Sequence, residues 1–131
     1  YESGTLNMPA IWSLKTSIEF LEENLEKISQ KEQLLTQRII SGLSSLPNVD
    51  LYKPTKRRVS TVCFNVKGVS SSDVVSYLDK NGICVRGGIH CAILAHETLG
   101  TVKTGAIRVS LNYMNTEQEV DYFLDVLREM K

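Results

Sequence analysis

The sequence has no excess of either charge, because fifteen Lys and Arg residues balance fifteen Asp and Glu residues. This balance gives no global electrostatic reason to bind nucleic acid or an anionic membrane. A basic cluster at Lys53, Lys56, Arg57 and Arg58 is local and adjoins Pro54, so we interpret it as a solvated turn. The sequence also lacks a recognisable signal peptide and any apolar run of membrane-spanning length. We therefore expect neither nucleic acid nor a membrane among its partners.

Cysteine is scarce as well, with three residues at irregular spacing, Cys63, Cys84 and Cys91. An odd number of unevenly spaced cysteines argues against a secreted disulfide framework and predicts a reducing, cytoplasmic setting. The length of 131 residues suits one domain with one core. The chain begins with Tyr1 rather than Met, and we expect it to be part of a longer protein.

Hydrophobic periodicity predicts helices at both ends of the chain. A long helix is expected over residues 9–46, with an interruption near Asn24, because an unbroken run of this length is unusual in a compact domain. Its apolar stripe recurs at steps of three and four residues, namely Ile11, Leu14, Ile18, Leu21, Leu25, Ile28, Leu35, Ile39, Leu43 and Leu46. Thr116 and Glu119 form a capping box for a last helix.

Between these helices the period changes to that of strands. Segments 49–52, 58–66, 83–86 and 106–111 are short and rich in β-branched residues, which is typical of strands. A further short helix is expected to begin at Ser72-Asp73 and to end at Asn81-Gly82. This order predicts a two-layer α+β domain, in which helices cover one face of a small, mostly antiparallel sheet.

One stretch, "RGGIHCAILAH" at residues 86–96, does not fit a structural role easily. We interpret Cys63 and Cys84 as buried structural thiols within strands, whereas Cys91 follows two glycines in a long segment with weak periodicity. Gly87 and Gly88 permit a sharp turn. The neighbouring His90 and Arg86 would favour the thiolate, which is the nucleophilic form of cysteine. Cys91 is therefore a candidate nucleophile, with an inert loop thiol as the alternative.

Two other interpretations of this segment are weaker. Cys84, His90, Cys91 and His96 are metal donors, but no CxxC or HxxxH spacing accompanies them, so we expect no metal site. A disulfide between Cys84 and Cys91 would need an oxidising environment.

Arg108 is the second candidate functional residue, because it is charged within the apolar strand segment "AIRVSL". It either lies on an exposed face or binds a carboxylate through its planar guanidinium. Arg86, at the end of another predicted strand, has the same two interpretations.

The motifs "VRGGIHCA" (85–92) and "TGAIRVSLNYMNTEQEVD" (104–121) resemble the carboxy-terminal part of cysteine desulfurases. These are fold-type I pyridoxal-phosphate enzymes of the class V aminotransferase group. The segment "YESGTLNMPAI" (1–11) is similar to the "FEAGTPN" segment of the same family, so the resemblance spans essentially the whole chain. It implies that residues 1–8 connect to a pyridoxal-phosphate-binding large domain. Residues 9–131 would then form the small domain, with the cysteine loop at about 87–104.

The resemblance also implies roles for individual residues. Cys91 matches the nucleophile that attacks the sulfur of the substrate L-cysteine on pyridoxal phosphate, leaving a persulfide and releasing L-alanine. Arg108 matches the arginine that binds the substrate carboxylate, and Arg86 matches an arginine that anchors the loop at the active-site entrance. Thr5 matches a threonine that reaches the cofactor phosphate, commonly across a dimer interface. A homodimer, a sulfur-acceptor protein and a role in iron–sulfur cluster assembly are expected with this family.

The chain departs from the family pattern in two places. The Schiff-base lysine motif Ser-x-His-Lys does not occur in it, so we expect these residues alone to be inactive. Ile93 occupies a position where relatives with the same "LAH" continuation often have proline, which leaves the rigidity of the loop open. Other interpretations are a class V aminotransferase or selenocysteine lyase domain, and a non-catalytic dimerisation or binding domain.

Overall fold

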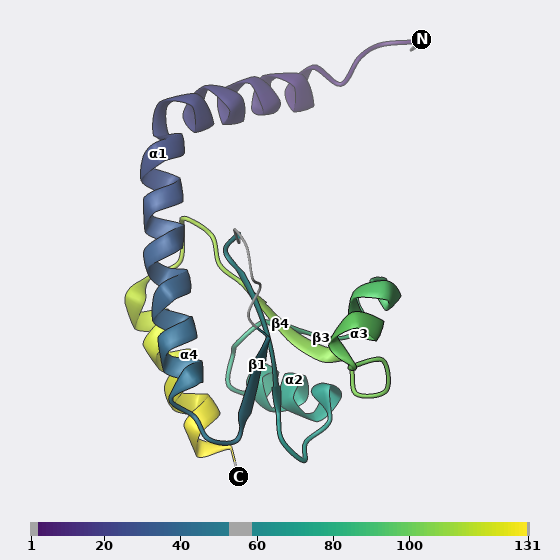
Figure 1. The fold of residues 1–131 in the computed structure, drawn as a ribbon. Helices are drawn as coiled ribbons and strands as arrows, with labels where there is room; N and C mark the ends of the chain where they lie inside the picture. Colours follow the sequence, from purple (N-terminus) through teal and green to yellow (C-terminus); the bar gives the residue numbers. More distant parts are fainter. Residues whose placement is uncertain (1–2, 53–58, 131) are drawn as a thin grey trace.

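A computed structural model describes residues 3–52 and 59–130 (Figure 1). In chain order the elements are α1 (Met8–Ser44), β1 (Val49–Tyr52), β2 (Thr61–Val66), α2 (Ser71–Lys80), β3 (Arg86–Gly88), α3 (Ile93–Leu99), β4 (Ala106–Ser110) and α4 (Glu117–Glu129). The strands pair antiparallel in the order β1-β2-β4-β3. The predicted α+β architecture with an antiparallel sheet is therefore confirmed. The basic cluster predicted as a turn falls on residues 53–58, outside the described residues.

The core lies between one face of the sheet and the helices α1, α2 and α4. In β2 every second residue is buried, and Phe64 at its centre is fully buried. The Phe64 ring packs edge-to-face on Phe123 of α4, with ring centroids 6.0 Å apart. Ile107 of β4 pairs with Phe64 across the sheet and is equally buried. Because side chains alternate along a strand, the intervening residues of β2 and β4 project from the opposite face, which these three helices leave uncovered.

The third strand is displaced from its predicted position. We expected a strand at 83–86, whereas β3 begins at Arg86 and includes both glycines. A Cβ on Gly87 would lie 2.7 Å from Cγ2 of Val75 and 2.9 Å from the carbonyl oxygen of Ser71. Gly87 thus allows β3 to lie close against α2, and it does not form the predicted turn. The displacement also leaves Cys84 outside the strand and exposed, so its assignment as a buried strand residue is wrong.

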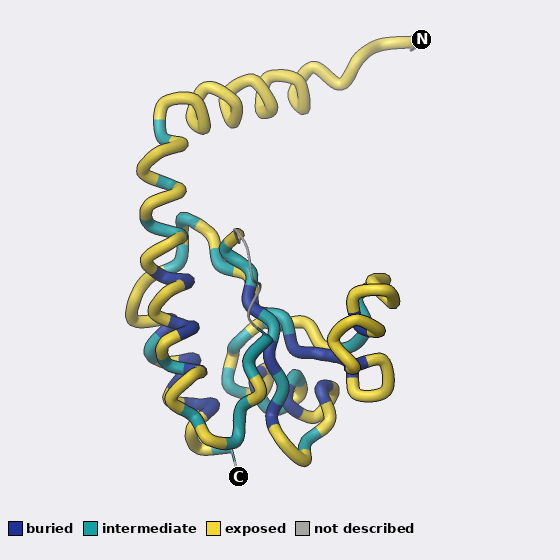
Figure 2. The backbone as a smooth tube through the Cα atoms, viewed as in Figure 1, coloured by how far each residue is buried: buried dark blue, intermediate teal, exposed yellow. Residues whose placement is uncertain are grey.

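Helix α1 continues through Asn24 without a break, so the interruption predicted near that residue is wrong. The helix instead bends sharply within its first half (Figure 1). At Asn24 the side-chain Nδ2 donates to the carbonyl of Phe20 at 2.9 Å, which competes with the helical hydrogen bond to the same oxygen and favours bending. The segment of α1 before the bend is exposed, whereas the buried residues of the helix begin at Leu35 (Figure 2).

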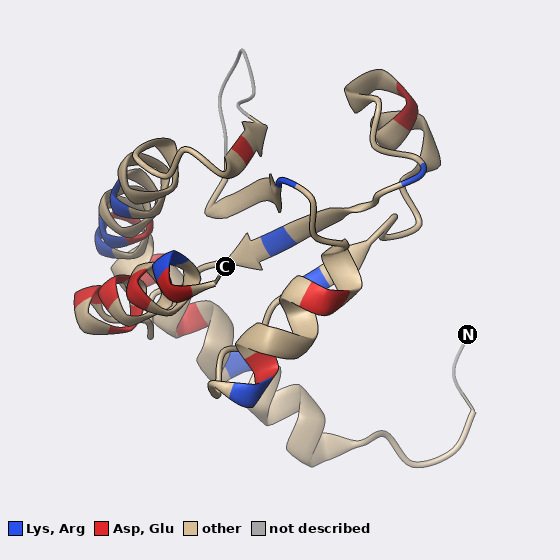
Figure 3. Ribbon diagram, turned by 90° about the horizontal axis from the view of Figure 1, so that it is seen from below, with Lys and Arg blue, Asp and Glu red and all other residues tan. Residues whose placement is uncertain are grey.

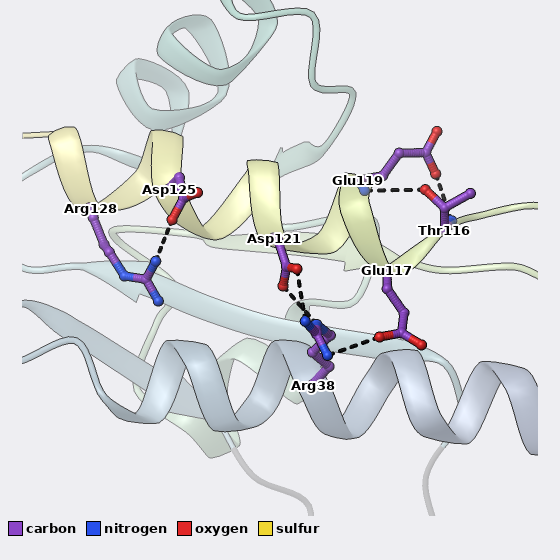
Figure 4. A network of polar contacts seen from close by, with 7 residues as sticks. All are labelled: Arg38, Thr116, Glu117, Glu119, Asp121, Asp125 and Arg128. Carbon is purple, nitrogen blue, oxygen red and sulfur yellow. Dashed lines mark hydrogen bonds and ion pairs between the residues drawn. The ribbon is translucent and has the colours of Figure 1, made fainter.

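A cluster of ion pairs connects the second half of α1 with α4 (Figure 4). Arg38 donates to both carboxylate oxygens of Asp121, from Nε at 2.7 Å and from Nη2 at 2.8 Å. Its Nη1 also donates to Glu117 at 3.0 Å. The capping box predicted at Thr116 and Glu119 is present and begins α4. The ion pairs therefore join α1 and α4 within the helix layer against which the sheet packs, and the capping box defines where α4 begins.

Charged residues of both signs occur along α1, α2 and α4, whereas α3 carries only Glu97 (Figure 3). No helix within the described part of the chain is long and apolar enough to cross a membrane.

Candidate functional site

The helix-free face of the sheet carries a row of four side chains, one from each strand. Tyr52 of β1 pairs with Cys63 of β2, Cys63 pairs with Arg108 of β4, and Arg108 pairs with Arg86 of β3. All four project from the face opposite Phe64 and Ile107, because they alternate with these core residues. The structure therefore brings the two predicted arginines together as directly opposed neighbours.

Two like charges directly opposite each other on a sheet destabilise it unless an anion lies between them. Neither Arg86 nor Arg108 forms an ion pair with another described residue. Arg86 is exposed and Arg108 is half-buried. Each guanidinium can donate two parallel hydrogen bonds to a carboxylate. The pair is therefore suited to bind a carboxylate or another anion on this face.

Cys63 lies next to Arg108 in the row, yet it is a poor nucleophile. Burial raises the pKa of the Cys63 thiol, and the nearby charge of Arg108 offsets this only in part. The thiol is therefore mostly protonated at neutral pH, whereas the thiolate is the reactive form. Cys63 lies within a strand as predicted, but it is half-buried on the helix-free face and not buried in the core, so that part of the prediction is wrong.

Cys91 lies on a tight turn between β3 and α3, and its side chain is exposed. Both His90 and Cys91 adopt the left-handed region, with φ of 54° and 57°. This conformation is uncommon for residues other than glycine, and two in succession indicate a strained turn. Gly88, with φ of 110°, begins it. The turn predicted at the two glycines is thus made by Gly88, His90 and Cys91.

His90 connects this turn to the row of arginines. Its Nε2 lies 3.0 Å from the carbonyl oxygen of Ala106, the first residue of β4. Burial lowers the pKa of His90, and the charges of Arg108 and Arg86 lower it further, although the contact with Ala106 acts in the opposite direction. The imidazole is therefore mainly neutral at pH 7. Ala106 lies two residues before Arg108 and pairs with Gly88, two residues after Arg86, so this contact brings the base of the Cys91 turn near both arginines.

Thr5 is exposed in the segment before α1. The structure does not bring it to the other three candidates, because α1 carries the amino-terminal end away from the sheet and from α3 (Figure 1). The resemblance assigns Thr5 to a site shared across a dimer interface. Its role stays a prediction.

The polar contacts of Asn65 and His96 are not predicted by the sequence, in which His96 is considered only as a metal donor. Asn65 of β2 donates from Nδ2 to the Tyr52 hydroxyl at 3.1 Å and to the Gly105 carbonyl at 2.9 Å, while its Oδ1 is buried without a partner. His96 of α3 is buried and bonded to Thr101. No periodic signal marks either residue, because their burial depends on contacts distant in sequence. Across the described residues, no three His, Cys, Asp or Glu side chains are grouped to bind a metal ion.

Comparisons with known proteins identify the family to which the chain belongs. The family model described as Aminotransferase class-V matches residues 1–123. A probable cysteine desulfurase of Synechocystis is 33% identical over 98% of this chain and 31% of its own length. A second one, from Methanothermobacter thermautotrophicus, is 31% identical over 99% of this chain and 33% of its own length. The chain thus spans about a third of the length of these curated relatives.

Solved structures give the same result for the fold. The apo structure of a cysteine desulfurase from Thermococcus onnurineus superposes with a TM-score of 0.88 at 35% identity, over 98% of this chain and 32% of that one. An S-sulfonic acid form of an Escherichia coli cysteine desulfurase gives a TM-score of 0.82 at 27% identity, over 96% of this chain and 31% of that one. On the matched family model, the chain belongs to the class V aminotransferase family.

Proposed function

We propose that this chain is the carboxy-terminal small domain of a pyridoxal-phosphate-dependent cysteine desulfurase, and that Cys91 accepts the sulfur. The observation that supports the proposal most strongly is the pair of opposed arginines on the helix-free face, beside a turn that exposes a thiol. Relatives named as cysteine desulfurases align over nearly the whole chain. In this proposal residues 1–8 connect to the large domain, and residues 9–131 form the small domain.

The residues present fit the proposed cofactor and substrate. Arg108, with Arg86 opposite it, would bind the carboxylate of L-cysteine through bidentate hydrogen bonds. The exposed hydroxyl of Thr5 would donate to the cofactor phosphate. Pyridoxal phosphate, when bound, supplies an electron sink that labilises bonds of the substrate amino acid. The family's Ser-x-His-Lys motif is not among these 131 residues, and the proposal assigns that lysine to another part of the protein.

The chemical step of this chain takes place at the Cys91 sulfur. The thiolate forms a bond to the substrate sulfur as the bond between that sulfur and Cβ breaks, and Cβ gains a proton to give L-alanine. The transferred sulfur is formally oxidised and Cβ is reduced, so Cys91 thiol and L-cysteine give Cys91 persulfide and L-alanine without an external oxidant. The left-handed backbone at His90 and Cys91 keeps the thiol exposed for this attack and for transfer to an acceptor.

The cellular setting follows as part of the same proposal. A persulfide must be passed on, so a sulfur-acceptor protein is the expected partner, and iron–sulfur cluster assembly is an expected destination of the sulfur. The three thiols are free, which suits the reducing cytoplasm. A homodimer would place Thr5 at the site of the partner subunit.

The test compares Cys91→Ala with Cys84→Ala, because both thiols are exposed and only the first lies on the strained turn. The protein expressed from its complete reading frame is given L-cysteine, and alanine and protein persulfide are quantified by mass spectrometry. We expect one alanine for each persulfide, with the persulfide located at Cys91 and lost in Cys91→Ala alone. Undiminished persulfide and sulfide release by Cys91→Ala would refute the role of Cys91.

Selenocysteine offers a second comparison, since selenium leaves carbon more readily than sulfur. Turnover of selenocysteine but not of cysteine by the unaltered protein would identify a selenocysteine lyase instead.

A further inference from the structure

The short helix that follows Cys91 has little to hold it by itself. Helix α3 contains seven residues, and its amino-terminal cap, Ala92, makes no side-chain hydrogen bond. Helices this short are unstable in isolation, so tertiary contacts must maintain them. Of its residues only His96 is buried, with 4% of its surface exposed. Whatever fixes α3 in place must therefore act largely through His96.

His96 is bonded to Thr101 in two ways. Its ring Nδ1 lies 2.7 Å from the Thr101 hydroxyl, and its carbonyl accepts from the Thr101 amide at 2.8 Å. Thr101 is also buried, with 4% of its surface exposed. The Thr101 carbonyl in turn accepts from the amide of Gly105 at 2.8 Å. A buried polar group without a partner is costly, so this arrangement of hydrogen bonds resists opening.

The chain of contacts ends at the strand that carries Arg108. Gly105 precedes β4 directly, and a Cβ on it would lie 2.7 Å from the Cα of Gly88 in β3. Residue 105 is thus tightly packed against the sheet. On the other side of Cys91, His90 contacts the carbonyl of Ala106, and its ring centroid lies 6.0 Å from that of His96. Both flanks of Cys91 are therefore attached to the start of β4.

We propose that His96 and Thr101 are positioning residues, a clamp that holds the Cys91 segment against the start of β4 and so fixes the thiol relative to Arg108. The inference rests on the proposed function only for its catalytic consequence, because the mechanical role is measurable without turnover. Among the described residues, neither His96 nor Thr101 is hydrogen-bonded to Cys91 or Arg108. They act through the backbone between Cys91 and Gly105.

Thr101→Val tests the clamp, because valine replaces the hydroxyl by a methyl group of similar size and leaves Nδ1 of His96 unpaired. Thr101→Ser retains the hydroxyl and should restore the contact. Thr98→Val is the matched control, since Thr98 is exposed on the same helix and, among the described residues, its hydroxyl bonds only to the Leu94 carbonyl of that helix. All variants are made in the protein expressed from its complete reading frame.

The first measurement is hydrogen exchange of the amides in residues 93–101, followed by mass spectrometry. Loss of one buried hydrogen bond should raise exchange there by about tenfold in Thr101→Val and leave Thr101→Ser and Thr98→Val near the unaltered protein. Exchange in α4 should stay unchanged in all variants, which separates local opening from general destabilisation.

The second measurement is persulfide formation with L-cysteine. We expect kcat to fall by about tenfold in Thr101→Val, with KM within about twofold, because Arg108 remains in place while Cys91 is less often aligned. Thr101→Ser should recover kcat.

Exchange in Thr101→Val equal to that in Thr98→Val would overturn the clamp. Raised exchange with unchanged kcat would overturn its positioning role, since α3 would then open without consequence for Cys91. If the unaltered protein forms no persulfide, the proposed function fails, and the exchange comparison alone decides whether the clamp exists.

Discussion

Replacing Gly87 by alanine tests the position of β3 and the arrangement of the two arginines together. Gly87 lies in β3 between Arg86 and Gly88, and its backbone φ is not positive, so alanine meets no backbone strain there. The added methyl group would instead lie 2.7 Å from Cγ2 of Val75 and 2.9 Å from the Ser71 carbonyl oxygen. Ordinary contacts begin at 3.4 Å, so a shift of about 0.7 Å is needed.

The two groups that the new methyl would contact differ in how easily they can move. The Val75 side chain can change rotamer, whereas the Ser71 carbonyl belongs to the backbone of the first turn of α2. Relief therefore requires β3 to move away from α2. Forcing one extra methyl group into a packed position costs about 1–3 kcal/mol. Because Arg86 precedes Gly87 and pairs with Arg108, the same movement would shift Arg86 relative to Arg108.

The assay is native-state hydrogen exchange of the β4 amides, which reports the local free energy of opening. We expect Gly87→Ala to lower this free energy by about 1–3 kcal/mol and, under the proposed function, to raise KM for L-cysteine more than it changes kcat. Val75→Ala, alone and combined with Gly87→Ala, completes a double-mutant cycle, in which the combined variant should recover part of the loss. Exchange and KM equal to those of the unaltered protein would refute the close approach of β3 to α2.

Three further results are expected. In Arg38→Gln the pKa of Asp121 should rise toward its ordinary value, because the hydrogen bond from Arg38 is the main cause of its lowering. The lowered pKa stabilises the folded protein above the ordinary Asp pKa, and this stabilisation is lost as pH falls through the folded pKa, so in Arg38→Gln it should become smaller. NMR titration of the Asp121 carboxyl measures the change. The pKa of His90 is lowered, chiefly by burial. Its contribution to stability is therefore present above the ordinary pKa of 6.5 and is lost as pH falls through the folded pKa. NMR of the His90 ring that shows titration above pH 6.5 would contradict this. Thr116→Ala should destabilise α4 by about 1 kcal/mol through loss of the cap, and Thr116→Ser should not, as judged by exchange in α4.

Much of the fold is predictable from local patterns. The alternation around Phe64 identifies β2, and the capping box at Thr116 marks the start of α4, because both signals come from residues adjacent in the chain. The β3 assignment failed because the apolar segment before Arg86 has strand character of its own. Its neighbours in space decided the outcome, since Gly87 fits against α2 and pairs with Ile107 across the sheet. Neither contact is visible in a local window.

The candidate site, too, is predictable from the sequence only in part. Cys91 stands out in the sequence because two glycines precede it, and Arg108 because it is charged among apolar residues. Their relation to each other depends on sheet register, and so does the opposition of Arg108 and Arg86. Cys84 illustrates the limit most clearly, because its local sequence is that of a buried strand residue while the structure exposes it.

The opposed arginines and the strained turn support one chemical interpretation when they are considered together. Two arginines at directly opposed register positions, without an acidic partner among the described residues, disfavour folding of the sheet. Left-handed backbone at two successive non-glycine residues, His90 and Cys91, is a second cost in the same small region. Costs of this kind persist where they serve binding or catalysis. The carboxylate of the proposed substrate would offset the first cost. The second would serve to hold an exposed thiol beside that substrate, so the proposed amino-acid substrate would account for both.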